Sequence, residues 1–165
     1  MLEIDTSNVL TDFRSNKIDV AIRNVRRVPT GLAVKKLLDT RLVPVCAPKL
    51  LEGPRPLRSP RDLIHHTLIS TSVRPDSWSR WLAAAGCGEI RPRKVLTFDT
   101  VPAGLEAAAR GAGVALAMDP LFWAAPIARE LTWPFATNIA GDASYSSCAA
   151  RRTQDVLPCA LFSIG

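Results

Sequence analysis

Few side chains in this sequence have the types and spacing that catalysis requires. His65 and His66 are adjacent, so on a strand their rings would point to opposite faces, and no third metal ligand follows nearby. Four cysteines lie far apart, without a Cys-x-x-Cys spacing: Cys46, Cys87, Cys148 and Cys159. No Gly-x-Ser-x-Gly turn exposes a nucleophilic serine. The sequence therefore predicts no catalytic centre, no metal and no cofactor, and it predicts buried, unpaired thiols.

Three features are better suited to binding a small ligand. A helix is predicted to begin near Val101, with Thr100 or Asp99 as its N-cap, and its free backbone N–H groups suit an anion. Three hydroxyls end the strand-like segment HTLIS: Ser70, Thr71 and Ser72. Ligands of open α/β sheets bind outside the carboxyl ends of the strands, so both segments would face one crevice. Arg23 ends the segment IDVAIR and could clamp a carboxylate. Capping alone, a polar turn and a surface charge remain the respective alternatives.

Strand-like segments alternate with helical ones along the chain. Strands are predicted at residues 1–5, 18–23, 31–38, 41–48, 66–70, 91–98, 114–118 and 144–150. The apolar run at 18–23 is typical of a buried parallel strand. Pro44 makes 41–48 an edge strand or a connection between lobes. This alternation predicts an α/β fold with a mainly parallel, doubly wound sheet.

Helices are predicted where caps and apolar spacing coincide. Ser59 and Pro60 together form a helix start. Residues 76–85 form an amphipathic helix whose apolar face carries Trp78, Trp81 and Leu82. The helix after Thr100 ends at Gly111 in the left-handed conformation. Three further segments are predicted: a short helix from Ser7 or Asn8, a helix at 120–131 interrupted by Pro126, and a strand or final helix at 156–164.

Composition limits the classes to which the protein can belong. The chain has 165 residues, 47% of them hydrophobic, which predicts one globular domain or one domain made of two lobes. Its net charge of +6 could attract nucleic acid, but the basic residues are scattered or in short clusters and aromatics are only 6%. The first residues do not form a signal peptide, and no apolar run approaches the roughly 20 residues that cross a bilayer. We therefore expect a soluble cytoplasmic protein without membrane contact.

Six segments, in this order and spacing, resemble the C-terminal effector-binding (substrate-binding) domain of LysR-type transcriptional regulators, particularly the glycine-cleavage-activator-like subgroup. They are IDVAIR, GLAVKKLLDTRLVPVCAPKLL, SPRDLIHHTLIS, DSWSRWLAAAG, FDTVPAGLEAAARGAGVALAM and LTWPF, and the resemblance covers roughly residues 1–135. It implies two Rossmann-like lobes like those of type 2 periplasmic binding proteins, with a small effector between them. It places crossover strands near 41–46 and 131–135. Lobe I is then about 1–45 plus 131–165, and lobe II is about 46–130.

The resemblance also implies a set of effector contacts: Arg23, Ser70, Thr71, Ser72, Thr100, Val101 and Asp119. No segment matches the family's N-terminal winged helix-turn-helix, or the first strand and helix of its effector domain, so lobe I is expected to be incomplete. The implied function is a sensor of an amino acid or organic acid, acting as a homodimer or higher oligomer and contacting DNA only through the missing domain. The alternatives are a stand-alone solute-binding protein, an enzyme on this scaffold, and a nonfunctional or purely dimerising remnant.

Overall fold

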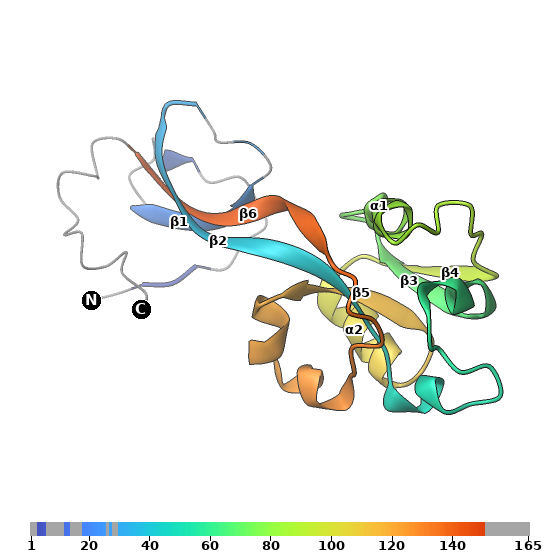
Figure 1. Ribbon diagram of the computed structural model, residues 1–165. Helices are drawn as coiled ribbons and strands as arrows, with labels where there is room; N and C mark the ends of the chain where they lie inside the picture. The colour runs from blue at the N-terminus through green and yellow to red at the C-terminus, as the bar shows by residue number, and fades with distance from the viewer. Residues whose placement is uncertain (1–2, 6–11, 14–17, 26, 28–29, 151–165) are drawn as a thin grey trace. The chain divides into compact units, whose positions relative to one another are not determined.

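The computed structural model describes residues 3–5, 12–13, 18–25, 27 and 30–150 (Figure 1). The chain divides into two compact units. Unit 1 lies within residues 1–39 and 142–165, and unit 2 is Thr40–Gly141. The lobe limits that the resemblance implied stay a prediction. The segments expected from Ser7 or Asn8 and at 156–164 fall wholly or mainly outside the described residues.

Unit 1 contains β1 (Val20–Val25), the first part of β2 (Leu32–Val45) and most of β6 (Ile139–Ala150). β1 runs antiparallel to β6, and β6 lies between β1 and β2 in the strand order. The prediction of a buried parallel strand at 18–23 was therefore wrong in direction, because β1 is antiparallel to its neighbour. It was also wrong in burial, because Ile22 is 64% exposed on one face of β1. Residues 3–5, predicted as part of a strand, adopt no regular structure, since alternation alone supplies no pairing partner.

β2 is a single strand of 14 residues where two separate strands were predicted. Pro44 lies inside it, opposite Leu116 of β5 (Val114–Asp119), and this pair of strands is antiparallel. Proline removes only its own N–H from the ladder. The flanking Val43 and Val45 are fully buried, and their packing holds the strand together around the missing donor.

The sheet of unit 2 is mainly parallel, as predicted, but it carries one antiparallel strand and is therefore mixed. β5 is parallel to β3 (Thr67–Thr71), and β3 is parallel to β4 (Lys94–Phe98), while β2 is antiparallel to β5. The strand order in this unit is β2-β5-β3-β4. α1 (Ser77–Ala84) connects β3 to β4, and α2 (Val101–Ala109) connects β4 to β5.

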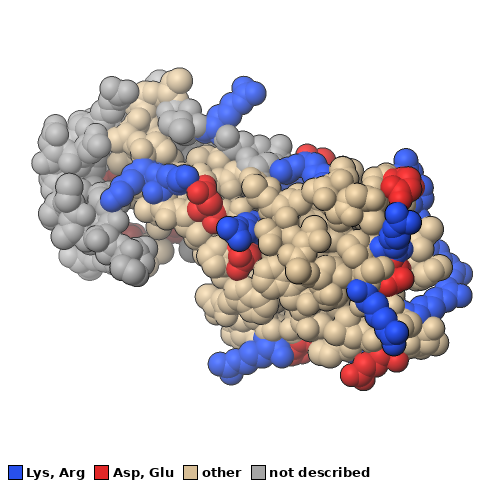
Figure 2. All heavy atoms as spheres, in the orientation of Figure 1, with Lys and Arg blue, Asp and Glu red and all other residues tan. Residues whose placement is uncertain are grey.

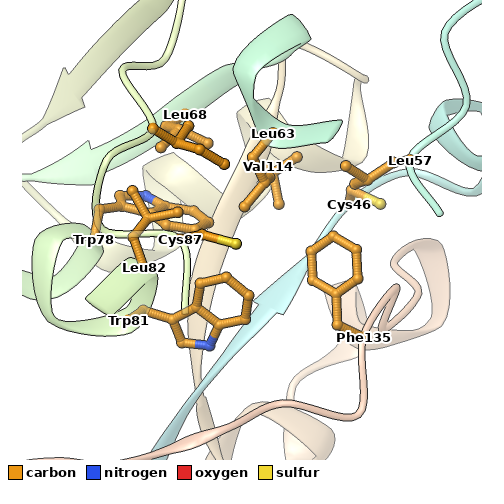
Figure 3. Packing of buried hydrophobic residues seen from close by; sticks show 11 residues of the cluster. Cys46, Leu57, Leu63, Leu68, Trp78, Trp81, Leu82, Cys87, Val114 and Phe135 are labelled. Atoms are coloured by element: carbon orange, nitrogen blue, oxygen red, sulfur yellow. The ribbon is translucent and has the colours of Figure 1, made fainter. Parts of the chain in front are cut away.

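The two helices of unit 2 cover opposite faces of this sheet. α1 buries Trp78, Trp81 and Leu82, as predicted, in one core cluster with Leu68 and Val114 (Figure 3). The Trp81 ring stacks on Phe135 with centroids 5.7 Å apart and meets the Trp78 ring edge-on at 5.9 Å. A second cluster lies under α2, and its members are Val43, Val45, Ile69, Leu105, Ala108, Ala115, Ala117, Phe122, Ala128 and Leu131. Neighbouring strand residues enter different clusters, so the sheet is doubly wound as the sequence predicted.

Four short 3-10 helices complete unit 2: η2 (Pro48–Leu51), η3 (Pro60–His65), η4 (Leu121–Ala124) and η5 (Pro126–Glu130). η3 begins after Ser59 as predicted, and η4 and η5 replace the helix expected at 120–131, with the break before Pro126. Gly111 follows α2 with φ +80°, which confirms the predicted stop. Gly113 lies against the backbone of Thr67, and a side chain there would overlap the Thr67 carbonyl oxygen.

Candidate functional site

A small pocket opens in unit 2 near the carboxyl ends of β3 and β5. Its volume is about 20 Å³, room for about one water molecule, so it suits one functional group of a ligand rather than a whole metabolite. The lining residues come from β2, β3, β5, α1, α2 and the turn after β3. They are Leu42, Ile69, Ser70, Thr71, Arg74, Ser77, Trp78, Val101, Leu116 and Met118.

Three of the predicted contact residues line this pocket, namely Ser70, Thr71 and Val101. Three others sit beside it without lining it: Ser72 follows Thr71, Thr100 precedes Val101, and Asp119 follows the pocket residue Met118. Arg23 belongs to β1 in unit 1, where it pairs with Ser146 of β6. Whether each of these side chains contacts a ligand stays a prediction.

The turn after β3 positions the polar side of the pocket. β4 holds the end of β3, with Thr71 opposite Phe98 and the N–H of Ser72 donating to the Phe98 carbonyl at 2.9 Å. The N–H of Arg74 then donates to the Thr71 carbonyl at 3.1 Å, and the N–H of Ser77 donates to the Arg74 carbonyl at 3.3 Å. This tight return places Arg74 and Ser77 in the lining of the same pocket as Ser70 and Thr71.

Trp78 fixes the opposite wall. Its indole Nε1 donates a hydrogen bond of 2.8 Å to the Ile69 carbonyl, the last backbone acceptor before Ser70. The indole ring is 6% exposed, so this bond is shielded from competing water. The remaining wall is apolar and consists of Leu42, Val101, Leu116 and Met118. The pocket therefore combines hydroxyl and guanidinium donors with an apolar surface.

α2 begins beside the pocket because it packs directly on β3. A Cβ on Gly104 would lie 3.2 Å from Cγ2 of Ile69, so only glycine gives this spacing without a shift. The Oγ1 of Thr100 accepts from the N–H of Ala103 at 3.4 Å, which confirms its predicted role as N-cap. Val101 at the first helical position is thereby held against the hydroxyls of β3.

Asp119 has a partner of its own at the end of β5. Its Oδ1 accepts a 2.9 Å hydrogen bond from Nε1 of Trp123. The Trp123 ring lies 4.8 Å from the Phe122 ring and 6.0 Å from the Trp133 ring, measured between centroids. The carboxylate therefore orients an aromatic cluster next to Met118, a role that the sequence did not reveal.

The thiols have the environment that the sequence predicted, as far as the structure describes them. Cys46, Cys87 and Cys148 are buried and free, while Cys159 is outside the described part. Burial raises the pKa of Cys46 to about 11, so its thiol stays protonated at neutral pH. Within residues 30–150 and the shorter described stretches, no three His, Cys, Asp or Glu side chains are grouped to hold a metal ion. None of the helices described is long and apolar enough to span a bilayer.

Sequence reasoning missed the residues that come to the pocket from the turn and from neighbouring strands. Arg74 carried a usable signal, because it is the only cation between the hydroxyls of β3 and the first residue of α1. Ser77 and Trp78 were assigned to a helix, but nothing in the sequence indicated which of their neighbours they would face. Leu42 and Met118 arrive by strand pairing over a long sequence separation.

Known proteins resemble this chain over most of its length. The model of the LysR substrate binding domain matches residues 1–160. The HTH-type transcriptional activator AmpR of Pseudomonas aeruginosa is 35% identical over 139 residues, covering 84% of this chain and 46% of that protein. The glycine cleavage system transcriptional activator of Escherichia coli is 37% identical over 124 residues, covering 75% of this chain and 40% of that protein. The chain thus spans about half the length of the curated relatives that it matches.

Solved structures agree with this assignment. The effector domain of AmpR from Pseudomonas aeruginosa shares 32% identity with a TM-score of 0.73, covering 90% of this chain and 70% of that one. The AmpR effector binding domain from Citrobacter freundii, at 24% identity, has a TM-score of 0.76, covers 98% of this chain and 83% of that one, and supports the fold alone. The chain belongs to the LysR family of transcriptional regulators and corresponds to their substrate-binding domain.

Proposed function

We propose that this chain is the ligand-sensing part of a transcriptional regulator and that its ligand binds at the pocket of unit 2. The pocket carries the proposal, because it gathers Ser70, Thr71 and Arg74 beside the first turn of α2 in a member of the LysR family. The pocket contains no nucleophile paired with a base, so the site is proposed to bind and not to catalyse.

The chemistry of the pocket favours an amino acid or another organic acid. A carboxylate can accept hydrogen bonds from a guanidinium and from hydroxyls, and Arg74, Ser70 and Thr71 supply these donors. Val101 and Met118 offer apolar contact to a short side chain of the ligand. The small volume fits the carboxylate itself, with the rest of the ligand outside the pocket.

Binding would act by shifting a conformational equilibrium, because a ligand stabilises whichever arrangement it binds better. DNA recognition would reside in a helix-turn-helix outside the matched region, in line with the names of the relatives. The working state is proposed to be a cytoplasmic homodimer or higher oligomer. In such an assembly a small change in each domain alters the geometry presented to DNA.

The test is a thermal-shift screen of amino acids and organic acids, followed by calorimetry of any hit. A ligand at about 100 times its Kd should add about 2.7 kcal/mol to the unfolding free energy. Thr71→Val removes a pocket hydroxyl and should weaken binding about 10-fold, the usual effect of losing a hydrogen bond to a charged group. Thr97→Val, in the neighbouring strand and outside the pocket, is the matched control and should leave Kd unchanged. Absence of stabilisation by every acid at millimolar concentration, or an equal loss in both variants, contradicts the proposal.

A further inference from the structure

Exposed lysine and arginine side chains gather where the three parallel strands of unit 2 begin. Lys94 is the first residue of β4 and lies opposite Thr67, the first residue of β3. Arg61 lies in η3, which leads into β3, and Arg110 ends α2, which leads into β5. Lys49 reaches the same place, because its ammonium donates to the Arg110 carbonyl at 2.9 Å. We call this set the basic edge; its members are Lys49, Arg58, Arg61, Arg91, Arg93, Lys94 and Arg110, all exposed.

The basic edge is separate from the pocket. Parallel strands begin at one edge of a sheet and end at the other, and the pocket hydroxyls Ser70 and Thr71 lie at the carboxyl end of β3. In the sequence these cations form short clusters that look scattered, and the pairing of β3 with β4 and β5 joins them. Figure 2 shows lysine and arginine side chains along the side where β4 begins in Figure 1, with fewer acidic side chains among them.

Four acidic side chains lie close to the edge in the sequence, namely Glu52, Asp62, Glu89 and Glu106, against seven cations, so the net charge stays positive. Asp62 accepts hydrogen bonds at its Oδ2 from the N–H groups of Arg58 and Ser59 and from the Ser59 hydroxyl. Its carboxylate therefore caps the N-terminus of η3. Glu106 pairs with Arg110 only at 4.0 Å, between exposed side chains. In the part of the chain that the structure describes, no ion-pair partner meets the cations that remain: Arg58, Arg61, Arg93 and Lys94.

We propose that the basic edge binds the phosphate backbone of duplex DNA without reading its sequence. Guanidinium groups match phosphate oxygens bidentately, and exposed lysine adds mobile positive charge. The members of the edge lie on a 3-10 helix, at strand starts and at a helix C-terminus, and not along one helix that could enter the major groove, so they suit phosphate contacts. This inference rests on the proposed function for the presence of DNA, since a tethered helix-turn-helix raises the local concentration of duplex near the edge.

The experiment measures fluorescence anisotropy of a labelled duplex of arbitrary sequence titrated with the 165-residue chain. The test variant combines Arg61→Gln, Arg93→Gln and Lys94→Gln. The control removes the same charge elsewhere through Arg27→Gln, Lys36→Gln and Arg41→Gln, at positions that are also exposed. Each lost phosphate contact lowers the salt slope by about 0.9, so the test variant should lose about 2.7 from that slope and bind at least about 10-fold more weakly at 50 mM salt. The control should retain the wild-type slope.

Three results would overturn the inference. The first is an absence of duplex binding by the wild-type chain at about 50 mM salt, where phosphate contacts are strong. The second is an equal loss of affinity in both triple variants, which would indicate an effect of net charge alone. The third is tighter binding of a polyglutamate of equal charge than of the duplex, which would indicate an acidic protein partner. Calorimetry with the screened acids separates the two proposals, because the variant of the basic edge should bind these acids as the wild type does. If no acid binds, the proposed function fails, but the anisotropy measurement of duplex binding still tests the basic edge.

Discussion

Gly104 inside α2 and Gly113 just before β5 should respond in opposite ways to substitution by alanine. Gly104 sits within α2, and an added Cβ would lie 3.2 Å from Cγ2 of Ile69, a side-chain methyl that needs to move by only a few tenths of an ångström. Gly113 precedes β5, and an added Cβ would lie 3.0 Å from both the carbonyl carbon and the Cβ of Thr67, and closer still to its carbonyl oxygen. Thr67 belongs to β3, whose pairing on both sides prevents its backbone from moving.

The magnitudes follow from these contacts. Gly104→Ala gains about 0.8–1.0 kcal/mol of helix propensity. It loses a few tenths of a kcal/mol to the close contact, about two or three atom pairs of dispersion energy. The unfolding free energy should therefore rise by about 0.5 kcal/mol on the propensity scale. Gly113→Ala must push β5 away from β3, weakening a ladder hydrogen bond worth about 1 kcal/mol. Overpacking costs about 1–3 kcal/mol more, so a fall of about 3 kcal/mol is expected.

Urea unfolding, followed by tryptophan fluorescence, measures both variants. A Gly113→Ala protein within about 1 kcal/mol of the wild type would show that β5 moves freely, and the packing argument would fail. A Gly104→Ala protein destabilised as much as Gly113→Ala would refute the distinction between an adjustable side chain and a fixed backbone. Because β5 also carries Leu116 and Met118, the Gly113→Ala protein should bind the proposed acid ligand more weakly.

Two further predictions concern single ionisable groups. Burial would raise the pKa of Asp62, but hydrogen bonds from the backbone of Ser59 and Arg58 and from the Ser59 hydroxyl, together with His65, lower it below 3.8. The carboxylate therefore stabilises the fold above pH 3.8, and this contribution is lost as the pH falls below the lowered pKa. In urea titrations, Asp62→Ala should lower the unfolding free energy by about 1 kcal/mol at neutral pH and leave it unchanged at acid pH. An equal loss at both pH values would contradict this. The pKa of Cys46, near 11, predicts that iodoacetamide labels it only after unfolding, as judged by mass spectrometry, and rapid labelling of the native protein would be inconsistent with its burial.

The helices of unit 2 were predictable because their signals are local. The spacing of Trp78, Trp81 and Leu82 puts all three on one side of a helix, and the structure buries that side. Thr100 and Gly111 mark the start and the end of α2 through backbone preferences that do not depend on the rest of the fold.

Strand pairing was harder to predict, because each partner lies far away in the sequence. An apolar run such as 18–23 does not specify whether its neighbour is parallel, and β1 pairs with β6, where Val20 is opposite Ala149. Pro44 suggested an interruption, yet the buried residues on either side of it continue β2. The partial prediction of the pocket has the same origin. Thr71 and Val101 end or begin elements and were found, whereas Leu42 depends on the pairing of β2 with β5.

The hydrogen bond from Trp78 to the Ile69 carbonyl gives the pocket one stiff wall and one compliant wall. A large guest cannot push the indole aside without breaking this bond and leaving the buried indole N–H without its acceptor, which costs about 1–3 kcal/mol. Met118, with its long unbranched side chain, can change rotamer at smaller cost. Discrimination between short and long forms of the proposed acid ligand should therefore reside at Met118, and selection for a different ligand would be expected to substitute this residue while retaining the tryptophan.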